Sequence, residues 1–440
     1  MNHTSQGALY ILPEPGLAQA DWLHQLLKED AAKGPVEAAL PQDEAEALAD
    51  ISGLALTPFN HGNLTPARHD MANWKTLISA HDTGPLYLVR NTEAAWGYET
   101  YYTFLRLAGR TSFTEISQRG PVSIDLPPLP LPSEISSILI TICGGIGNVI
   151  QATPVLTACV ENGMATYFAP ASDSDGSSLA ALFEDAMLPG LIVVDPADAH
   201  EVVADLVLNL ENRNLLSPSD AFFSPYRVGV DLSESGLYGA FLRNVTGMAS
   251  DPAATFVGGH SVEVDDSLLG RVVVCPGSKP GWEPKRWPHM NELLTRLDNP
   301  LVLCLDQDLA IYAETQGLTP ITASNAQFAT DLELGQAAQV LRAAKAVLAN
   351  DCGLAHMAAA VGAPTLILFG PSSERRNQPR RDNVRALSLD MECRPCQGRQ
   401  TGLGKLGPYS SSCMNDFACL KGLTVDHVFS ELQTLFKEKG

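Results

Sequence analysis

The segment from Ala346 to Ser373 contains residues suited to binding a phosphate group. It reads AVLANDCGLAHMAAAVGAPTLILFGPSS, an apolar strand-like run that leads into a helix. Gly353 lets the backbone approach a ligand closely, and Asp351 is a good N-cap residue for the helix. His356 falls on the first turn, so free N–H groups, the helix dipole and an imidazole face one region. The pattern favours a diphosphate site over the alternative of a core histidine.

A second segment, Val272 to Leu297, carries a complementary set of polar residues. A strand-like run is followed by a loop with Gly277 and Ser278, and then by Lys285-Arg286-Trp287-Pro288 at the start of a helix. The Ser278 hydroxyl and the loop amides can bond phosphate oxygens, and Lys285 supplies a mobile point charge suited to a diphosphate. We interpret Trp287 as a packing anchor rather than a platform for a base.

A third candidate is a glycine loop that follows the apolar run Ile138 to Ile142. Gly144-Gly145-Ile146-Gly147 precedes Asn148, where a helix begins. Glycines permit a tight turn close to a ligand, and the helix start can bind an anion. The dinucleotide-binding loop of an oxidoreductase is a weaker interpretation, because its third glycine is missing at Gln151 or Ala152. Alone, the loop does not distinguish a ligand site from a plain strand-to-helix turn.

Together these segments resemble glycosyltransferase family 9, the heptosyltransferase family. The glycine loop and Pro154 fit the pattern G-[DN]-x-x-x-x-x-P-x-L, and the stretches K-R-W-P and D-C-G-L-A-H are the more specific parts. The resemblance extends over Ile138 to Gly440. It implies an α/β protein of the GT-B type, in which two Rossmann-like parallel-sheet domains face a cleft. It also implies metal-free, inverting transfer of a heptose or related sugar from a nucleotide-sugar donor of the ADP-heptose type to a lipopolysaccharide-type or protein acceptor.

The resemblance also implies roles for individual residues. Lys285 and His356 would stabilise the leaving diphosphate, and Asp308 lies where the family places an acid that contacts the nucleoside. Cys352 stands where the family usually has Thr or Ser. The full donor site that the resemblance implies consists of Gly145, Gly147, Gly277, Ser278, Lys285, Asp308, Asp351, Cys352, Gly353 and His356.

Asn148 is the main departure from the family pattern. That position is usually an aspartate, taken as the base that deprotonates the acceptor hydroxyl, whereas an amide cannot accept a proton at neutral pH. We expect Asn148 to orient the acceptor or a water, and a carboxylate from elsewhere could supply the base. The alternative function is a catalytically impaired sugar-nucleotide-binding protein that acts in assembly or partner binding.

Four of the nine cysteines cluster near the C-terminus. Cys393-x2-Cys396 is followed after 16 residues by Cys413 and after five more by Cys419. Four thiolates with one close pair could hold a structural zinc or iron tetrahedrally, and some protein-modifying heptosyltransferases use such a cluster for iron. Reduced cysteines that pack a loop are the alternative.

Charge and hydropathy restrict the partners. The net charge of −21 argues against a general nucleic-acid binder and against attachment to anionic lipid by bulk charge, so at most peripheral membrane association is expected. No run approaches the ~18 apolar residues of a membrane span. The first residues lack the pattern of a signal peptide, so the sequence predicts a cytoplasmic protein.

Composition changes along the chain predict four regions. Residues 1–125 form an N-terminal extension that we expect to be mainly helical, and a homo-oligomer could form through it. The stretch LPPLPLP, with four prolines in seven residues, is a stiff connector. Alternating strand-like and helical stretches then predict a first Rossmann-like domain on the acceptor side over 133–262, and a second on the nucleotide-sugar side over 263–385. Residues 386–440 hold the cysteine-containing loop and a C-terminal helix expected to cross back to the first domain.

Overall fold

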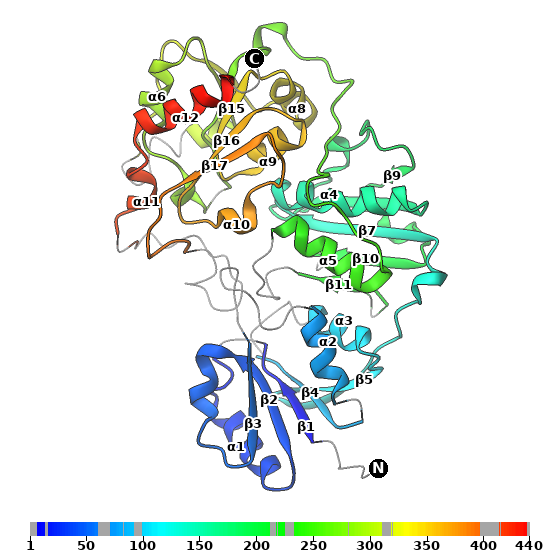
Figure 1. The fold of residues 1–440 in the computed structure, drawn as a ribbon. Helices are drawn as coiled ribbons and strands as arrows, with labels where there is room; N and C mark the ends of the chain where they lie inside the picture. Colours follow the sequence, from blue (N-terminus) through cyan, green and yellow to red (C-terminus); the bar gives the residue numbers. More distant parts are fainter. Residues whose placement is uncertain are drawn as a thin grey trace.

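Three separate sheets, each made mainly of parallel strands, organise the chain (Figure 1). The computed structural model describes residues 7–13, 16–59, 71–81, 83–91, 99–211, 217, 219–224, 233–279, 281–309, 318, 320–396, 413 and 415–437. None of the helices in these ranges combines the length and the apolar character that crossing a bilayer requires.

The N-terminal sheet has six strands in the order β3-β2-β1-β4-β5-β6, with only β6 antiparallel to its neighbour. Its strands are β1 (Ala8–Ile11), β2 (Val36–Pro41), β3 (Leu54–Phe59), β4 (Leu86–Val89), β5 (Ser112–Ser117) and β6 (Gly120–Asp125). Its helices are α1 (Asp21–Ala31), α2 (Met71–Ser79) and α3 (Glu99–Leu107).

The prediction of a mainly helical N-terminal region is therefore wrong. The runs ALYI, VEAALP and LYLV are short and apolar, and each forms a buried strand at the centre of this sheet. Buried parallel strands are near-continuous apolar runs rather than alternating ones, so they are hard to separate from buried pieces of helix. The stretch after β2 forms a 3-10 helix over Gln42–Leu48.

The middle sheet has five parallel strands in the order β11-β10-β7-β8-β9. They are β7 (Ser137–Gly144), β8 (Ala165–Ser172), β9 (Leu191–Val193), β10 (Leu206–Leu210) and β11 (Ala221–Phe223). Helix α4 (Ile146–Glu161) follows β7 after a single residue, Gly145, and α5 (Glu234–Thr246) packs beside α4. The glycine loop thus joins the central strand to its helix.

The third sheet has six parallel strands in the order β14-β13-β12-β15-β16-β17. They are β12 (Val272–Cys275), β13 (Leu301–Cys304), β14 (Gln327–Thr330), β15 (Ala346–Asn350), β16 (Thr365–Phe369) and β17 (Val384–Ser388). Its helices are α6 (Met290–Arg296), α8 (Leu334–Arg342), α9 (Gly353–Ala360), α10 (Glu374–Asn377), α11 (Ala418–Lys421) and α12 (Val425–Lys437).

The three sheets share one strand order. The first strand of each, β1, β7 or β12, is central. The next two strands lie on one side of it, and the strands after those lie on the other. This reversal is the point at which doubly wound sheets bind ligands, in the crevice beyond the carboxyl ends of the strands. In the second and third sheets this point lies at the starts of α4 and α9.

The C-terminal helix α12 packs on the third sheet, beside β15, β16 and α6. Its buried face, Val428 and Leu432, joins the same apolar cluster as Trp287 and Leu294. Trp287 is fully buried, and its Nε1 donates to the carbonyl of Leu423 just before the helix. The predicted crossing to the first Rossmann-like domain is therefore wrong for the described residues, because the apolar face of α12 is used within its own domain.

Helix α3 joins the N-terminal sheet to the middle sheet. The Thr103 hydroxyl donates to the carbonyl of Phe222 at 2.8 Å and accepts from its N–H at 3.0 Å, so α3 covers the edge strand β11. The buried Arg106 guanidinium donates to the carbonyls of Pro127 and Ser219 at 2.7 and 3.0 Å. These contacts tie the two units together through backbone acceptors.

Replacing Arg106 by alanine should destabilise this joint. The change leaves several buried carbonyls without their donor, which costs about 2–4 kcal/mol. Calorimetry of the full chain should show the unfolding transition shifted to lower temperature or split in two. Arg119→Ala, at an exposed position of the same unit, is the control and should unfold like the wild type; equal unfolding of both variants would contradict the assignment.

Candidate functional site

The glycine loop and the D-C-G-L-A-H segment meet where the second and third sheets face each other. A Cβ atom on Gly147 would lie 2.6 Å from Cδ2 of His356, and one on Gly353 would lie 3.0 Å from Cβ of Ile146. The first distance is too short for a side chain and the second is tight, so the two glycines allow α4 and α9 to touch by their N-terminal ends. Two sites expected separately from sequence therefore form one.

Lys285, Asp351 and His356 form a buried polar group at this junction. Lys285 Nζ lies 2.7 Å from Oδ2 of Asp351 and 4.5 Å from the ring centre of Trp282. Asn377 Nδ2 donates to the same Asp351 oxygen at 2.9 Å, and His356 Nε2 lies 4.0 Å from the other. Asp351 thus fixes the lysine, and it does not cap α9, whose N-cap position is Cys352.

Burial and charge set the protonation of this group. Burial lowers the pKa of His356, although Asp351 and Glu234 oppose the shift, so the imidazole is neutral at pH 7. Burial would raise the pKa of Asp351, but Lys285 and His356 outweigh it and hold that pKa below its usual value. His356 Nδ1 is buried and has no hydrogen-bond partner among the described residues. A neutral imidazole and an ammonium together suit a phosphate oxygen.

The loop after β12 is organised by Arg286. Its guanidinium donates to Oδ1 of Asp308 at 2.7 Å and to Oγ of Ser278 at 2.9 Å. A Cβ atom on Gly277 would lie 2.3 Å from Asp308 Oδ2, so that glycine allows the carboxylate to approach. Burial raises the pKa of Asp308, against the effect of Arg286. Contacts of Asp308 and Ser278 with a nucleotide stay predictions; in this structure both hold the loop.

Glu234 is the residue that sequence reasoning missed. Asn148 Nδ2 donates a hydrogen bond to Oε1 of Glu234, the first residue of α5. Tyr238 Oη, one turn later, donates to the same oxygen at 3.2 Å, and Arg376 of the third sheet's unit lies 3.4 Å from the other. The glutamate is 1% exposed. A carboxylate thus lies beside the amide that replaces the family aspartate.

A second carboxyl group, Glu211, lies next to the first at the end of β10. Tyr238 Oη also donates to Glu211, which links the two acids. Burial and the charge of Glu234 raise the pKa of Glu211 to about 8. No local pattern indicates this pair, because α5 and β10 are brought together only by tertiary packing. A pair of carboxyls with different protonation is a frequent arrangement for acid–base chemistry.

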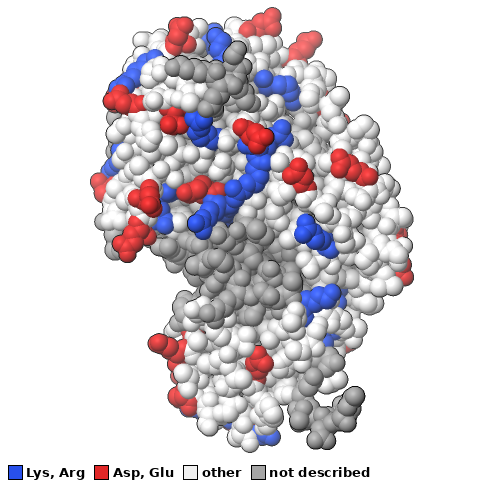
Figure 2. All heavy atoms as spheres, in the orientation of Figure 1, with Lys and Arg blue, Asp and Glu red and all other residues white. Residues whose placement is uncertain are grey.

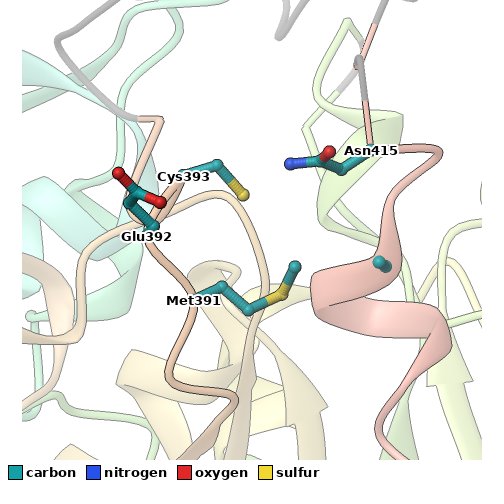
Figure 3. Close-up of a pocket in the computed structure, with 5 residues that line it drawn as sticks. Met391, Glu392, Cys393 and Asn415 are labelled. Carbon is teal, nitrogen blue, oxygen red and sulfur yellow. The ribbon is translucent and has the colours of Figure 1, made fainter.

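The four C-terminal cysteines come from two segments, one after β17 and one before and within α11. Burial, together with the other three sulfurs, raises the pKa of Cys419 to about 11. Met391, Glu392, Cys393 and Asn415 line a cavity of about 700 Å³ between the two segments (Figure 3). Over the described part of the chain, no three His, Cys, Asp or Glu side chains are arranged to hold a metal ion. The predicted loop 398–412 lies outside the described residues.

Basic side chains are unevenly distributed on this acidic protein. Figure 2 shows them gathered in a band beside α10, where Arg375 and Arg380 are exposed. The buried Arg376 of the same helix faces Glu234 instead. Positive charge is therefore concentrated near the junction of the two sheets.

Comparison with known proteins relates part of the chain to one family. Residues 260–406 match the family profile described as Glycosyltransferase family 9 (heptosyltransferase). This segment is similar to a glycosyltransferase family 9 domain. It is 29% identical over 188 residues to lipopolysaccharide heptosyltransferase 2 of Salmonella typhimurium and 34% identical over 118 residues to lipopolysaccharide heptosyltransferase 1 of Pseudomonas aeruginosa. These matches cover 41% and 26% of this chain, and 50% and 33% of the relatives, so the chain spans half or less of their length.

The fold resembles that of a solved bacterial glycosyltransferase. The iron-containing dodecameric glycosyltransferase TibC from enterotoxigenic E. coli superposes with a TM-score of 0.52 and 14% identity, over 73% of this chain and 79% of TibC. A second TibC structure, in complex with ADP-D-beta-D-heptose, matches with the same TM-score of 0.52. The likeness shows the fold alone, and it confirms the predicted GT-B arrangement of parallel-sheet domains.

The protonated Glu211 should make stability depend on pH. Its folded pKa of about 8 exceeds the ordinary 4.5, so it contributes stability at low pH that is lost as pH rises through the folded value. Between about pH 5 and pH 8, the wild type should lose roughly 2 °C or more of melting temperature relative to Glu211→Gln. Glu201→Gln, at an exposed position, should follow the wild type. Parallel pH curves for wild type and Glu211→Gln would contradict the shift.

Proposed function

We propose that this protein is a glycosyltransferase that moves a heptose or related sugar from an ADP-linked donor to a glycolipid or protein acceptor. The observation that carries the proposal is the contact of α4 and α9, which sets Lys285, Asp351 and His356 against the glycine loop. The family 9 match over residues 260–406, which include Lys285, Asp351 and His356, supports it, as does the likeness to TibC, a heptosyltransferase solved with ADP-heptose.

The donor's diphosphate would lie between the two helix ends. Lys285 is held by Asp351 at 2.7 Å, and the imidazole of His356 lies across the junction from Gly147. When the bond to the sugar breaks, negative charge develops on the leaving phosphate oxygen. A preorganised ammonium and the N–H groups at the start of α9 stabilise that charge in a site shielded from water. These residues do this without a metal.

The same observations favour a second candidate, a sugar-nucleotide-binding protein without turnover. Asn148 cannot accept a proton, and the groups that would hold the diphosphate are independent of it. The two candidates share nucleotide binding and differ only in turnover. Release of ADP from ADP-heptose by the purified chain distinguishes them.

Nucleotide binding tests the shared part of the proposal. Lys285→Ala removes a charge-assisted hydrogen bond and should weaken ADP binding about 10- to 100-fold by calorimetric titration. Lys345→Ala, an exposed lysine of the same unit, should bind ADP like the wild type, and NAD should bind to neither. Unchanged ADP affinity in a folded Lys285→Ala variant would contradict the site.

We further propose that Cys393, Cys396, Cys413 and Cys419 bind one structural iron or zinc. Support comes from their proximity, through which each sulfur affects the pKa of Cys419, and from the iron that TibC is described as containing. The sulfurs are not placed as a finished metal site in this structure, so binding requires the two segments to draw together.

Elemental analysis tests the metal proposal. The purified full chain should hold about one equivalent of iron or zinc, and Cys393→Ser with Cys396→Ser should remove it. Cys159→Ser, which alters a buried cysteine of the middle domain, is the control and should keep the metal. Less than about a tenth of an equivalent in wild type would refute the proposal.

A further inference from the structure

We propose that Glu234 takes the place of the missing aspartate as the general base of the transfer; this inference rests on the proposed transferase function. Its carboxylate accepts a hydrogen bond from Nδ2 of Asn148, the residue at the family's base position. A glutamate from α5 therefore reaches the space beside the first turn of α4. The family pattern usually has a negative charge at position 148, and here Glu234 of the neighbouring helix α5 supplies one beside that position.

Besides Asn148, two side chains and the start of α5 hold the Glu234 carboxylate in place. Ser233 caps α5 by accepting from the N–H of Gly236 at 3.2 Å, so Glu234 lies at a helix N-terminus, where a negative charge is favoured. Tyr238 Oη donates at 3.2 Å to Oε1, and Arg376 lies 3.4 Å from Oε2. A base held in one orientation can receive a proton without rearrangement of its surroundings.

Glu234 rather than Glu211 is the member of the pair that can accept a proton. Burial and the neighbouring charge raise the pKa of Glu211 to about 8, so it is already protonated at neutral pH. Tyr238 donates to both acids and joins them. Arg376 lies 3.4 Å from Oε2 of Glu234, so the carboxylate has a cation beside it.

The position of Glu234 also fits the donor site. Two residues of the third sheet's unit interact with the Glu234 carboxylate: Arg376 lies 3.4 Å from it, and the charge of the carboxylate acts on His356 of the diphosphate site. Separation of the two sheets would uncover Glu234, and a donor bound between them would set its anomeric carbon between the carboxylate and the diphosphate groups. The base and the leaving group would then lie on opposite sides of the reacting carbon, as inverting displacement requires.

In the proposed transfer, the acceptor O–H bond breaks, and its proton moves to a carboxylate oxygen of Glu234. The oxygen's electron pair forms the new bond to the anomeric carbon. The bond from that carbon to the phosphate oxygen breaks, and its electron pair leaves with the nucleoside diphosphate, next to Lys285 and His356.

Glu234→Gln tests the inference in the full chain, with ADP-heptose as the donor and water as the acceptor. ADP release should fall about 100-fold or more, while the ADP dissociation constant stays within about threefold of the wild type. Asn148→Asp in the Glu234→Gln background restores an acid at the family position and should recover at least about a tenth of the lost rate. Glu161→Gln, at the exposed end of α4, should leave the rate unchanged.

Other outcomes separate the two proposals. If the wild type neither binds ADP nor releases it from ADP-heptose, the proposed function fails. If the wild type turns over and Glu234→Gln keeps its rate, the function stands and the role of Glu234 is overturned. If the wild type binds ADP without turnover and Asn148→Asp gains turnover, Glu234 is not the base. If Glu234→Gln does not fold, Glu234→Asp serves instead: the shorter acid should lower the rate and keep ADP binding, and an undiminished rate would overturn the inference.

Discussion

The site depends on the absence of two Cβ atoms where α4 and α9 meet. Gly147 lies against the His356 ring, too close for a Cβ atom without a shift of the ring, and Gly353 lies against Ile146, where a Cβ atom would be a tight fit. This contact brings the carboxyl ends of two sheets together at the points where their strand orders reverse. The glycines therefore have two consequences: the backbone turns from strand to helix, and residues from two domains come into one buried group.

Charge balance follows from that contact. Two ion pairs lie close together, Lys285 with Asp351 inside one unit and Arg376 with Glu234 between units. Buried charges are tolerated when they are paired and hydrogen-bonded, and the loss of one partner is costly. A diphosphate that enters this region meets an ammonium, a guanidinium and a neutral imidazole. The junction thus combines cations for a leaving group with a carboxylate for an incoming hydroxyl.

Sequence predicted the donor side well because its information is local. The stretches K-R-W-P and D-C-G-L-A-H each lie between a strand and a helix, so a few consecutive residues define both position and chemistry. Glu234 could not be predicted, because its pairing with Asn148 depends on how α5 packs on α4, 86 positions away along the chain. Asp351 is predicted to cap α9, but its carboxylate instead accepts hydrogen bonds from Lys285 Nζ and Asn377 Nδ2.

The N-terminal unit shows the limit of periodicity. Its strands are short, apolar and buried, so they lack the alternation of polar and apolar residues that would identify them as strands. The N-terminal sheet has the same reversed strand order as the other two sheets, and Thr103 and Arg106 join it to the middle sheet. A sheet of this type is itself a frame for ligand sites, but the candidate site residues of this chain lie on the other two.

The most direct test is an experimental structure of the full chain with ADP bound. The account predicts that the diphosphate lies between α4 and α9, with its oxygens within hydrogen-bond distance of Lys285 Nζ and His356, and that Glu234 faces the open space beyond the terminal phosphate. A diphosphate bound away from this junction, with Lys285 still paired only to Asp351, would contradict it.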